Sequence, residues 1–137
     1  MSAELGSAGT SAPSLHHVAV GTRDVEALAR FYARLLQTEE RRRHVDEAGA
    51  LRSVWLDLAG TWLMIERAET SAPLARVEGV GLGAFLLAFR ANAAERGAFE
   101  QRAMALGAAI ESRSAYSSYL RDPDGNRIAV SEYEVAP

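Results

Sequence analysis

Hydrophobic residues occur along the chain in short runs whose period changes from one segment to the next. The run from Leu15 to Val20 is nearly continuous, which predicts a short buried strand. From Val25 to Leu36 apolar side chains recur every three or four residues, which predicts a helix with one buried stripe. Thr22 and Asp24 come just before it and can cap its first turn. The chain therefore opens with a strand and a helix.

Three more strands are expected in the first half. Residues 38–45 are polar and rich in arginine, which favours an edge strand, because charge at a sheet edge discourages unwanted pairing. Residues 52–58 alternate between apolar and polar side chains, as a strand with one buried face does. After a turn at Ala59-Gly60, residues 61–66 form a further apolar strand.

The second half repeats this order. The expected elements are a strand at 84–89, a helix from Asn92 to Leu106, and strands at 108–112, 116–121 and 127–133. Asn92 and Glu95 have the spacing of a capping box, and Gly107 is placed to end the helix. Each half is thus a strand, a helix and three strands. One such repeat cannot bury both faces of its sheet, whereas two can curve around a shared cleft.

Charge and hydropathy restrict the possible partners. The 137 residues suit one domain, and the net charge of −3 is small. The one basic run, Arg41–His44, lies between acidic residues that cancel most of its field, so we expect no nucleic-acid partner. No apolar run approaches the roughly 20 residues of a membrane span, so we expect no membrane partner.

The absence of cysteine excludes structural disulfides and thiolate metal sites, and it fits a reducing compartment. Residues 1–13 are small and polar, without the basic start and apolar stretch of a secretory signal, and predict a disordered tail. We therefore expect a cytoplasmic protein with a single domain at 14–137. Module one covers about 14–67, a linker about 68–80, and module two about 81–134.

Two motifs near the ends of the domain resemble a known superfamily. The opening motif is Leu15–Val20 with Asp24, Phe31-Tyr32 and Leu35-Leu36, and the closing motif is Asp122-Pro123-Asp124-Gly125-Asn126-Arg127-Ile128. At this spacing they resemble the vicinal-oxygen-chelate superfamily, which has the fold of glyoxalase I, bleomycin-resistance proteins and extradiol dioxygenases. The resemblance implies an α+β fold in which two βαβββ modules form a cupped mixed sheet, and it implies a homodimer.

Enzymes of that superfamily hold a divalent metal in the cup, where it acts as a Lewis acid on two substrate oxygens. The resemblance places the first-strand ligand at His17. The equivalent position of module two holds Leu86, and the position after the closing turn holds Ala129. Neither side chain can bind a metal, and a catalytic site needs about three protein ligands. We therefore expect no cofactor, with His17 as the only remnant of a metal site.

The remaining donors do not complete the set. The last-strand position of module one falls at about Leu63 or Met64, and Glu66 shares the strand face of Met64. His16 and His17 are adjacent on a strand, so we expect them to point to opposite faces. If Glu66 and His17 face one cup, the carboxylate would raise the proton affinity of the imidazole and the two would form an acid–base pair.

The candidate ligand-binding residues are His17, Trp55, Trp62, Met64, Glu66, Leu86, Tyr116, Tyr119, Arg121 and Ala129. Trp55, Tyr116 and Tyr119 lie on matching strands of the two halves. They either line a pocket for an aromatic or amphipathic molecule or pack in the core. Arg121 either binds a carboxylate or phosphate or anchors neighbouring aspartates.

Three functions remain open. The first is a glyoxalase-like or bleomycin-resistance-like protein with a degenerate metal site that binds a small hydrophobic or aromatic molecule in the cup. The second is a metal-dependent lyase, isomerase or dioxygenase with an unusual site at His17 and Glu66. The third is a non-catalytic interaction module.

Overall fold

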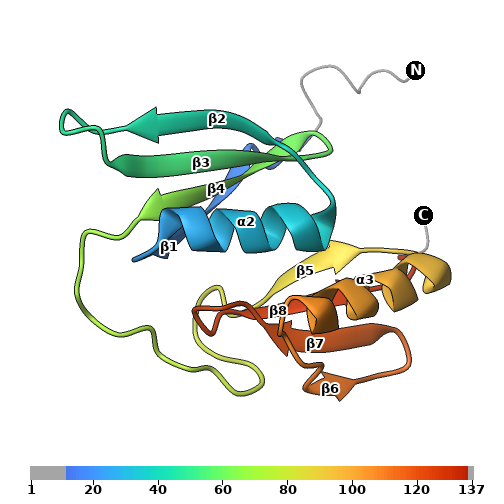
Figure 1. Ribbon diagram of the computed structural model, residues 1–137. Coiled ribbons are helices and arrows are strands. Elements are labelled where there is room, and N and C mark those ends of the chain that lie inside the picture. The colour runs from blue at the N-terminus through green and yellow to red at the C-terminus, as the bar shows by residue number, and fades with distance from the viewer. Residues whose placement is uncertain (1–11, 136–137) are drawn as a thin grey trace.

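The structure is a computed structural model that describes residues 12–135, so the tail predicted at 1–13 lies almost entirely outside the described residues. The elements are β1 (His17–Thr22), α2 (Val25–Leu36), β2 (Glu40–Val45), β3 (Leu51–Leu58), β4 (Thr61–Arg67), β5 (Leu87–Arg90), α3 (Ala93–Ala105), β6 (Ser112–Arg113), β7 (Ser117–Arg121) and β8 (Arg127–Ser131). The predicted order of a strand, a helix and three strands is confirmed in both halves (Figure 1).

The strands form two four-stranded mixed sheets of the same topology. Their orders are β1-β4-β3-β2 and β5-β8-β7-β6, and in each the first strand runs parallel to the last while the other pairs are antiparallel. The predicted α+β fold of paired βαβββ modules is therefore confirmed. The arginine-rich strand β2 lies at the edge of its sheet, as its charge predicted.

Local sequence signals fix both helices. The side chain of Asp24 accepts a hydrogen bond from the backbone N–H of Ala27, which caps α2. At α3 the capping box is complete, since the side chains of Asn92 and Glu95 each bond the other's backbone N–H. Gly107, with φ of 86°, follows the end of α3 in the left-handed region that glycine adopts without strain.

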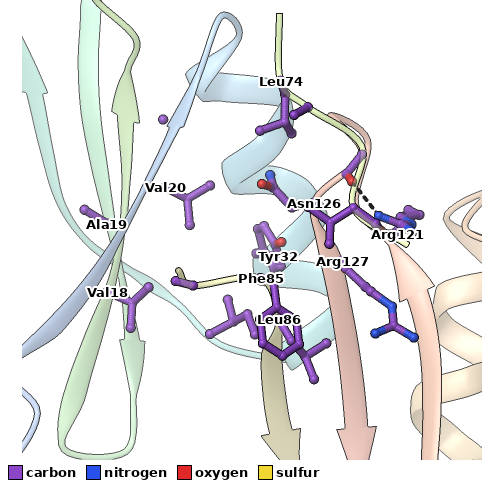
Figure 2. A pocket seen from close by; sticks show the side chains of 16 residues that line it. Val18, Ala19, Val20, Tyr32, Leu74, Phe85, Leu86, Arg121, Asn126 and Arg127 are labelled. Atoms are coloured by element: carbon purple, nitrogen blue, oxygen red, sulfur yellow. Dashed lines mark hydrogen bonds between the residues drawn. The ribbon is translucent and has the colours of Figure 1, made fainter. Parts of the chain in front are cut away.

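One hydrophobic core joins the two modules. It contains the buried stripe of α2, the helix-side residues of β3 and β4, and Phe99, Leu120 and Ile128 of module two. Helix α2 lies between the two sheets (Figure 2). There the Arg102 guanidinium of α3 donates to the carbonyl oxygen of Leu35 at 2.9 Å. Because the helix-bearing faces of both sheets share this core, the opposite faces of the sheets are turned outward.

Element boundaries differ from the predictions in module two. Strand β5 begins at Leu87 rather than at residue 84, because pairing with β8 starts at the Leu87–Ile128 pair. The strand predicted at 108–112 overlaps the observed strand β6, Ser112–Arg113, only at Ser112, because Ser112 and Arg113 are the residues that pair in register with β7. Among residues 12–135, no helix combines the length and hydropathy needed to cross a membrane.

Candidate functional site

Each sheet has one face against the shared core and one open face, and the open faces carry most of the predicted site residues. We define the first open face by the alternate residues of the first sheet: His17, Ala19 and Gly21 of β1, Trp62, Met64 and Glu66 of β4, Ser53, Trp55 and Asp57 of β3, and Arg42 and His44 of β2. Every candidate from module one therefore lies on one surface.

The centre of the first open face is aromatic. The rings of Trp55 and Trp62 have centroids 6.1 Å apart, and the His44 ring lies 5.3 Å from that of Trp55. Met64 is directly opposite Trp55 on the neighbouring strand. The two tryptophans and the methionine are all partly exposed, unlike the buried residues of the helix side of this sheet. This face therefore presents a continuous apolar surface.

A chain of hydrogen bonds crosses the aromatic surface and ends at a carboxylate. The indole N–H of Trp55 donates to the Ser53 hydroxyl at 2.9 Å, and that hydroxyl donates to Glu66 Oε2 at 2.5 Å. Ser53 is only 2 % exposed, so the chain is shielded from water. The orientation of the Glu66 carboxylate is thus set by the neighbouring strand.

The two adjacent histidines do not diverge as expected. Their Nδ1 atoms lie 2.9 Å apart and their rings meet edge to face, so the prediction that they point to opposite faces is wrong. The reason is that β1 begins at His17, which leaves His16 outside the strand and free of its alternation. His17 and Glu66 share the open face but are not neighbours. His17 pairs with Trp62, four residues from Glu66, which is roughly 13 Å along a strand.

The open face of the second sheet is built from smaller side chains. Ala129 pairs with Tyr119 and with Ala88, and the Arg127 guanidinium lies 4.6 Å from the centroid of the Tyr119 ring. Ala129 is only 1 % exposed beneath these neighbours. This second open face is turned away from the first, so one chain does not bring the candidates of the two modules together.

Tyr116 and Arg121 have structural surroundings. Tyr116 precedes β7 and packs edge to face on Tyr133, with ring centroids 5.1 Å apart, away from the other candidates. The Arg121 side chain donates to the carbonyl oxygens of Val77 and Gly125, and it forms an ion pair with Glu111 at 3.2 Å. Arg121 thus fastens the linker to the second sheet instead of anchoring the aspartates beside it.

A pocket of about 420 Å³ lies between the modules, and sequence reasoning identified only Leu86 and Arg121 of its lining. Val18 and Val20 point into this intermodule pocket, while Ala19, between them on β1, points away (Figure 2). The linker closes one side of the pocket. No sequence signal shows the path of the linker, so the pocket could not be predicted.

Polar groups around the intermodule pocket are already bonded within the protein. The Tyr32 hydroxyl donates to Asp122 Oδ2 at 2.6 Å, and the amide of Asn126 donates to the same oxygen at 2.8 Å. Burial and the neighbouring Asp122 charge raise the pKa of Tyr32, which keeps this hydroxyl a donor. The pocket therefore offers apolar surface and few free polar groups.

Comparison with known families places the chain. The family model described as a glyoxalase-like domain matches residues 17–131. The chain belongs to the glyoxalase-like domain family. The predicted membership of the vicinal-oxygen-chelate superfamily is thereby confirmed. No curated protein sequence matches the chain.

Solved structures of similar fold support the glyoxalase-like assignment. Fosfomycin resistance protein FosX from Listeria monocytogenes has a TM-score of 0.74 at 19% identity, with 91% of this chain and 94% of that chain covered. FosX from Mesorhizobium loti has a TM-score of 0.74 at 18% identity, with coverages of 91% and 95%. Lactoylglutathione lyase from Agrobacterium tumefaciens has a TM-score of 0.60 at 25% identity, with coverages of 87% and 92%.

One of the structures of similar fold raises the question of a metal, since a mutant of Listeria FosX was solved as a complex with Mn(II) and 1S,2S-dihydroxypropylphosphonic acid. The donors of this chain do not fit such an ion. Of the four positions that the superfamily resemblance assigns, only His17 has a nitrogen or oxygen donor. Leu86 and Ala129 have hydrocarbon side chains, and the fourth position falls at about Leu63 or Met64. Within residues 12–135, no three side chains of histidine, aspartate or glutamate are grouped as a metal site would require.

Proposed function

We propose that this glyoxalase-like protein binds a small hydrophobic or aromatic molecule on its first open face without a metal ion. The observation that carries the proposal is the pair of partly exposed tryptophans beside Met64 on the face that the superfamily uses as its cup. Ligand sites are mostly apolar, with a few oriented polar groups, and the bonded pair Ser53–Glu66 supplies such a group here.

The loss of metal donors supports binding in place of chelation chemistry. Leu86 and Ala129 replace two ligands by apolar side chains, and the His17–Glu66 separation leaves no acid–base pair on the same face. The geometry therefore favours the binding function over an enzyme that uses these two residues. With no disulfide to form, the cysteine-free chain is suited to the cytoplasm, which we propose as its location.

We further propose that the protein acts as a homodimer. The two open faces are turned outward in one chain, so the first open face of one copy needs the second open face of another copy to enclose a ligand. Strands β1 and β5 each pair with only one other strand among the described residues, which leaves one edge of each sheet available for a partner. Light scattering on the purified protein should give the mass of two chains.

The test of binding uses N-phenyl-1-naphthylamine, a neutral aromatic probe whose fluorescence rises in apolar sites. We expect saturable binding that is unchanged by dialysis against a chelator, with metal content well below one ion per chain. Trp62→Leu should weaken binding at least about fivefold, because a tryptophan supplies much of the contact area of such a site. Tyr133→Leu, at an exposed aromatic away from this face, is the matched control.

Two results would contradict the proposal. The first is a probe signal that does not saturate, or that Trp62→Leu leaves unchanged. The second is a stoichiometric metal that survives dialysis and whose removal abolishes binding. Absence of any probe binding by a folded protein would favour the interaction-module alternative.

A further inference from the structure

Glu66 is a carboxylate on the aromatic surface without a cation of its own. Among residues 12–135 it takes part in no ion pair, whereas Asp57 of the same face and Asp46 each pair with an arginine. Its Oε2 atom is bonded by Ser53, while Oε1 accepts no hydrogen bond from the described residues. A partly buried carboxylate gains from a charged partner, because burial weakens its hydration. The side chain is therefore held in position with one oxygen unused.

Other charged groups of the first open face do not neutralise Glu66. Asp57 is paired with Arg41 at 3.2 Å. Arg42 lies opposite Trp55 in register, whereas Glu66 lies opposite Ser53, and no ion pair joins Arg42 to Glu66 in the part of the chain that the structure describes. The imidazole of His44 packs on Trp55, and its buried Nε2 atom makes no hydrogen bond. His17, the remaining titratable group of this face, lies opposite Trp62.

The strand beside Glu66 leaves its unused oxygen accessible. Gly21 is the register partner of Glu66 and Ala19 that of Met64, so β1 places at most a methyl group on this part of the face. The apolar strip begins at Trp62 and ends at Glu66, four residues or roughly 13 Å along β4. A ligand that follows the strip meets aromatic rings first and a carboxylate last.

We propose that the molecule bound on this face is an amphipathic amine, whose apolar body lies over Trp55 and Trp62 and whose cationic nitrogen binds Glu66. This inference rests on the proposed function, since it names the class of ligand for the same site. A carboxylate attracts an ammonium group, and the faces of indole rings attract cations as well. An anionic end group would be repelled by Glu66, and among the described residues of the same chain the one arginine of this face, Arg42, lies opposite Trp55 and not Glu66.

The test compares three compounds with one apolar body: 4-phenylbutylamine, which is a cation at pH 7, the neutral 4-phenylbutan-1-ol, and the anion 4-phenylbutyrate. Each displaces bound N-phenyl-1-naphthylamine. The amine should compete about tenfold better than the alcohol, because a charge-assisted contact at a partly buried site strengthens binding by about this factor. The carboxylate should compete worst. Glu66→Gln should remove the advantage of the amine and leave the alcohol unchanged. Glu69→Gln, which removes an exposed carboxylate just beyond β4, should change neither.

The outcomes separate the inference from the proposed function. If N-phenyl-1-naphthylamine does not bind the folded protein, the proposed function fails and this inference with it. If it binds but the alcohol or carboxylate competes as well as the amine, the proposed function stands and this inference is wrong. The inference is also wrong if Glu66→Gln, shown by circular dichroism to be folded, keeps the preference for the amine. Glu66→Asp, which retains the charge, should keep part of that preference.

Discussion

Replacing Tyr32 by phenylalanine tests how the two modules are held together. Tyr32 is fully buried on α2, and its hydroxyl donates to Asp122 in the closing turn of module two at 2.6 Å. Asp122 also accepts from the backbone N–H groups of Asp124 and Asn126 and from the Asn126 amide. The variant deletes one of these four bonds and leaves the ring in place. The Asp122 carboxylate then keeps three hydrogen-bond donors and no buried polar group is left unbonded. The variant should therefore lose only the free energy of one charge-assisted hydrogen bond.

One such bond contributes about 1.5 kcal/mol, the lower end of the range for hydrogen bonds to charged groups. For a domain of this length that loss lowers the midpoint of thermal unfolding by about 5 °C. Urea unfolding of both proteins should give the free-energy difference at an unchanged m-value. Tyr133→Phe, with an exposed side chain, should shift neither quantity. A Tyr32→Phe variant as stable as the parent would refute this account of the contact between modules.

Three further predictions concern acid stability, helix capping and the intermodule pocket. The hydrogen bond from the Arg113 guanidinium holds the pKa of Glu100 below its usual 4.5, so the ionised carboxylate stabilises the fold above about pH 4.5. That stabilisation is lost as the pH falls below about 4.5. Glu100→Gln should therefore make the free energy of unfolding depend less on pH in this acid range. Asn92→Ala removes the cap of α3 and should cost about 1 kcal/mol in urea unfolding, whereas equal stability would show that the cap is dispensable. Val20→Trp fills the intermodule pocket and should leave the affinity for N-phenyl-1-naphthylamine unchanged; weaker binding would place the probe in that pocket.

Much of the fold could be predicted because local signals agree with each other. The alternation at residues 52–58, the stripe of α2 and the capping box at Asn92 each set an element that the structure contains. The end of the linker was harder to predict. Its apolar residues at 84–86 have the composition of a strand, yet only the residues from Leu87 have a partner strand to pair with. Pairing with a distant segment, which local sequence does not encode, decided that boundary.

The site was predictable only within each module. The alternation of side chains along a strand correctly placed Trp55 on the face of the sheet away from the helix. It also grouped Trp62, Met64 and Glu66 on one strand face. The hydrogen bond from Ser53 to Glu66 depends on the register between β3 and β4. The separation of His17 from Glu66 depends on the register between β1 and β4. Likewise, the outward direction of the two open faces follows from α2 packing between the sheets. Strand register and sheet orientation are set by tertiary packing, so the spacing of residues in the sequence could not predict them.

That outward direction makes ligand binding depend on assembly. One open face covers only one side of a flat molecule, whereas ligand sites bury most of their ligand's surface. If a second copy supplies the opposite wall, probe affinity should fall when the protein is diluted below the concentration at which light scattering shows dissociation into single chains. Circular dichroism at the same concentrations must show that the chains remain folded, so that loss of affinity is not loss of fold. Equal affinity in folded single chains would mean that Trp55, Trp62 and Met64 suffice alone, and the proposed role of the dimer in enclosing the ligand would be wrong.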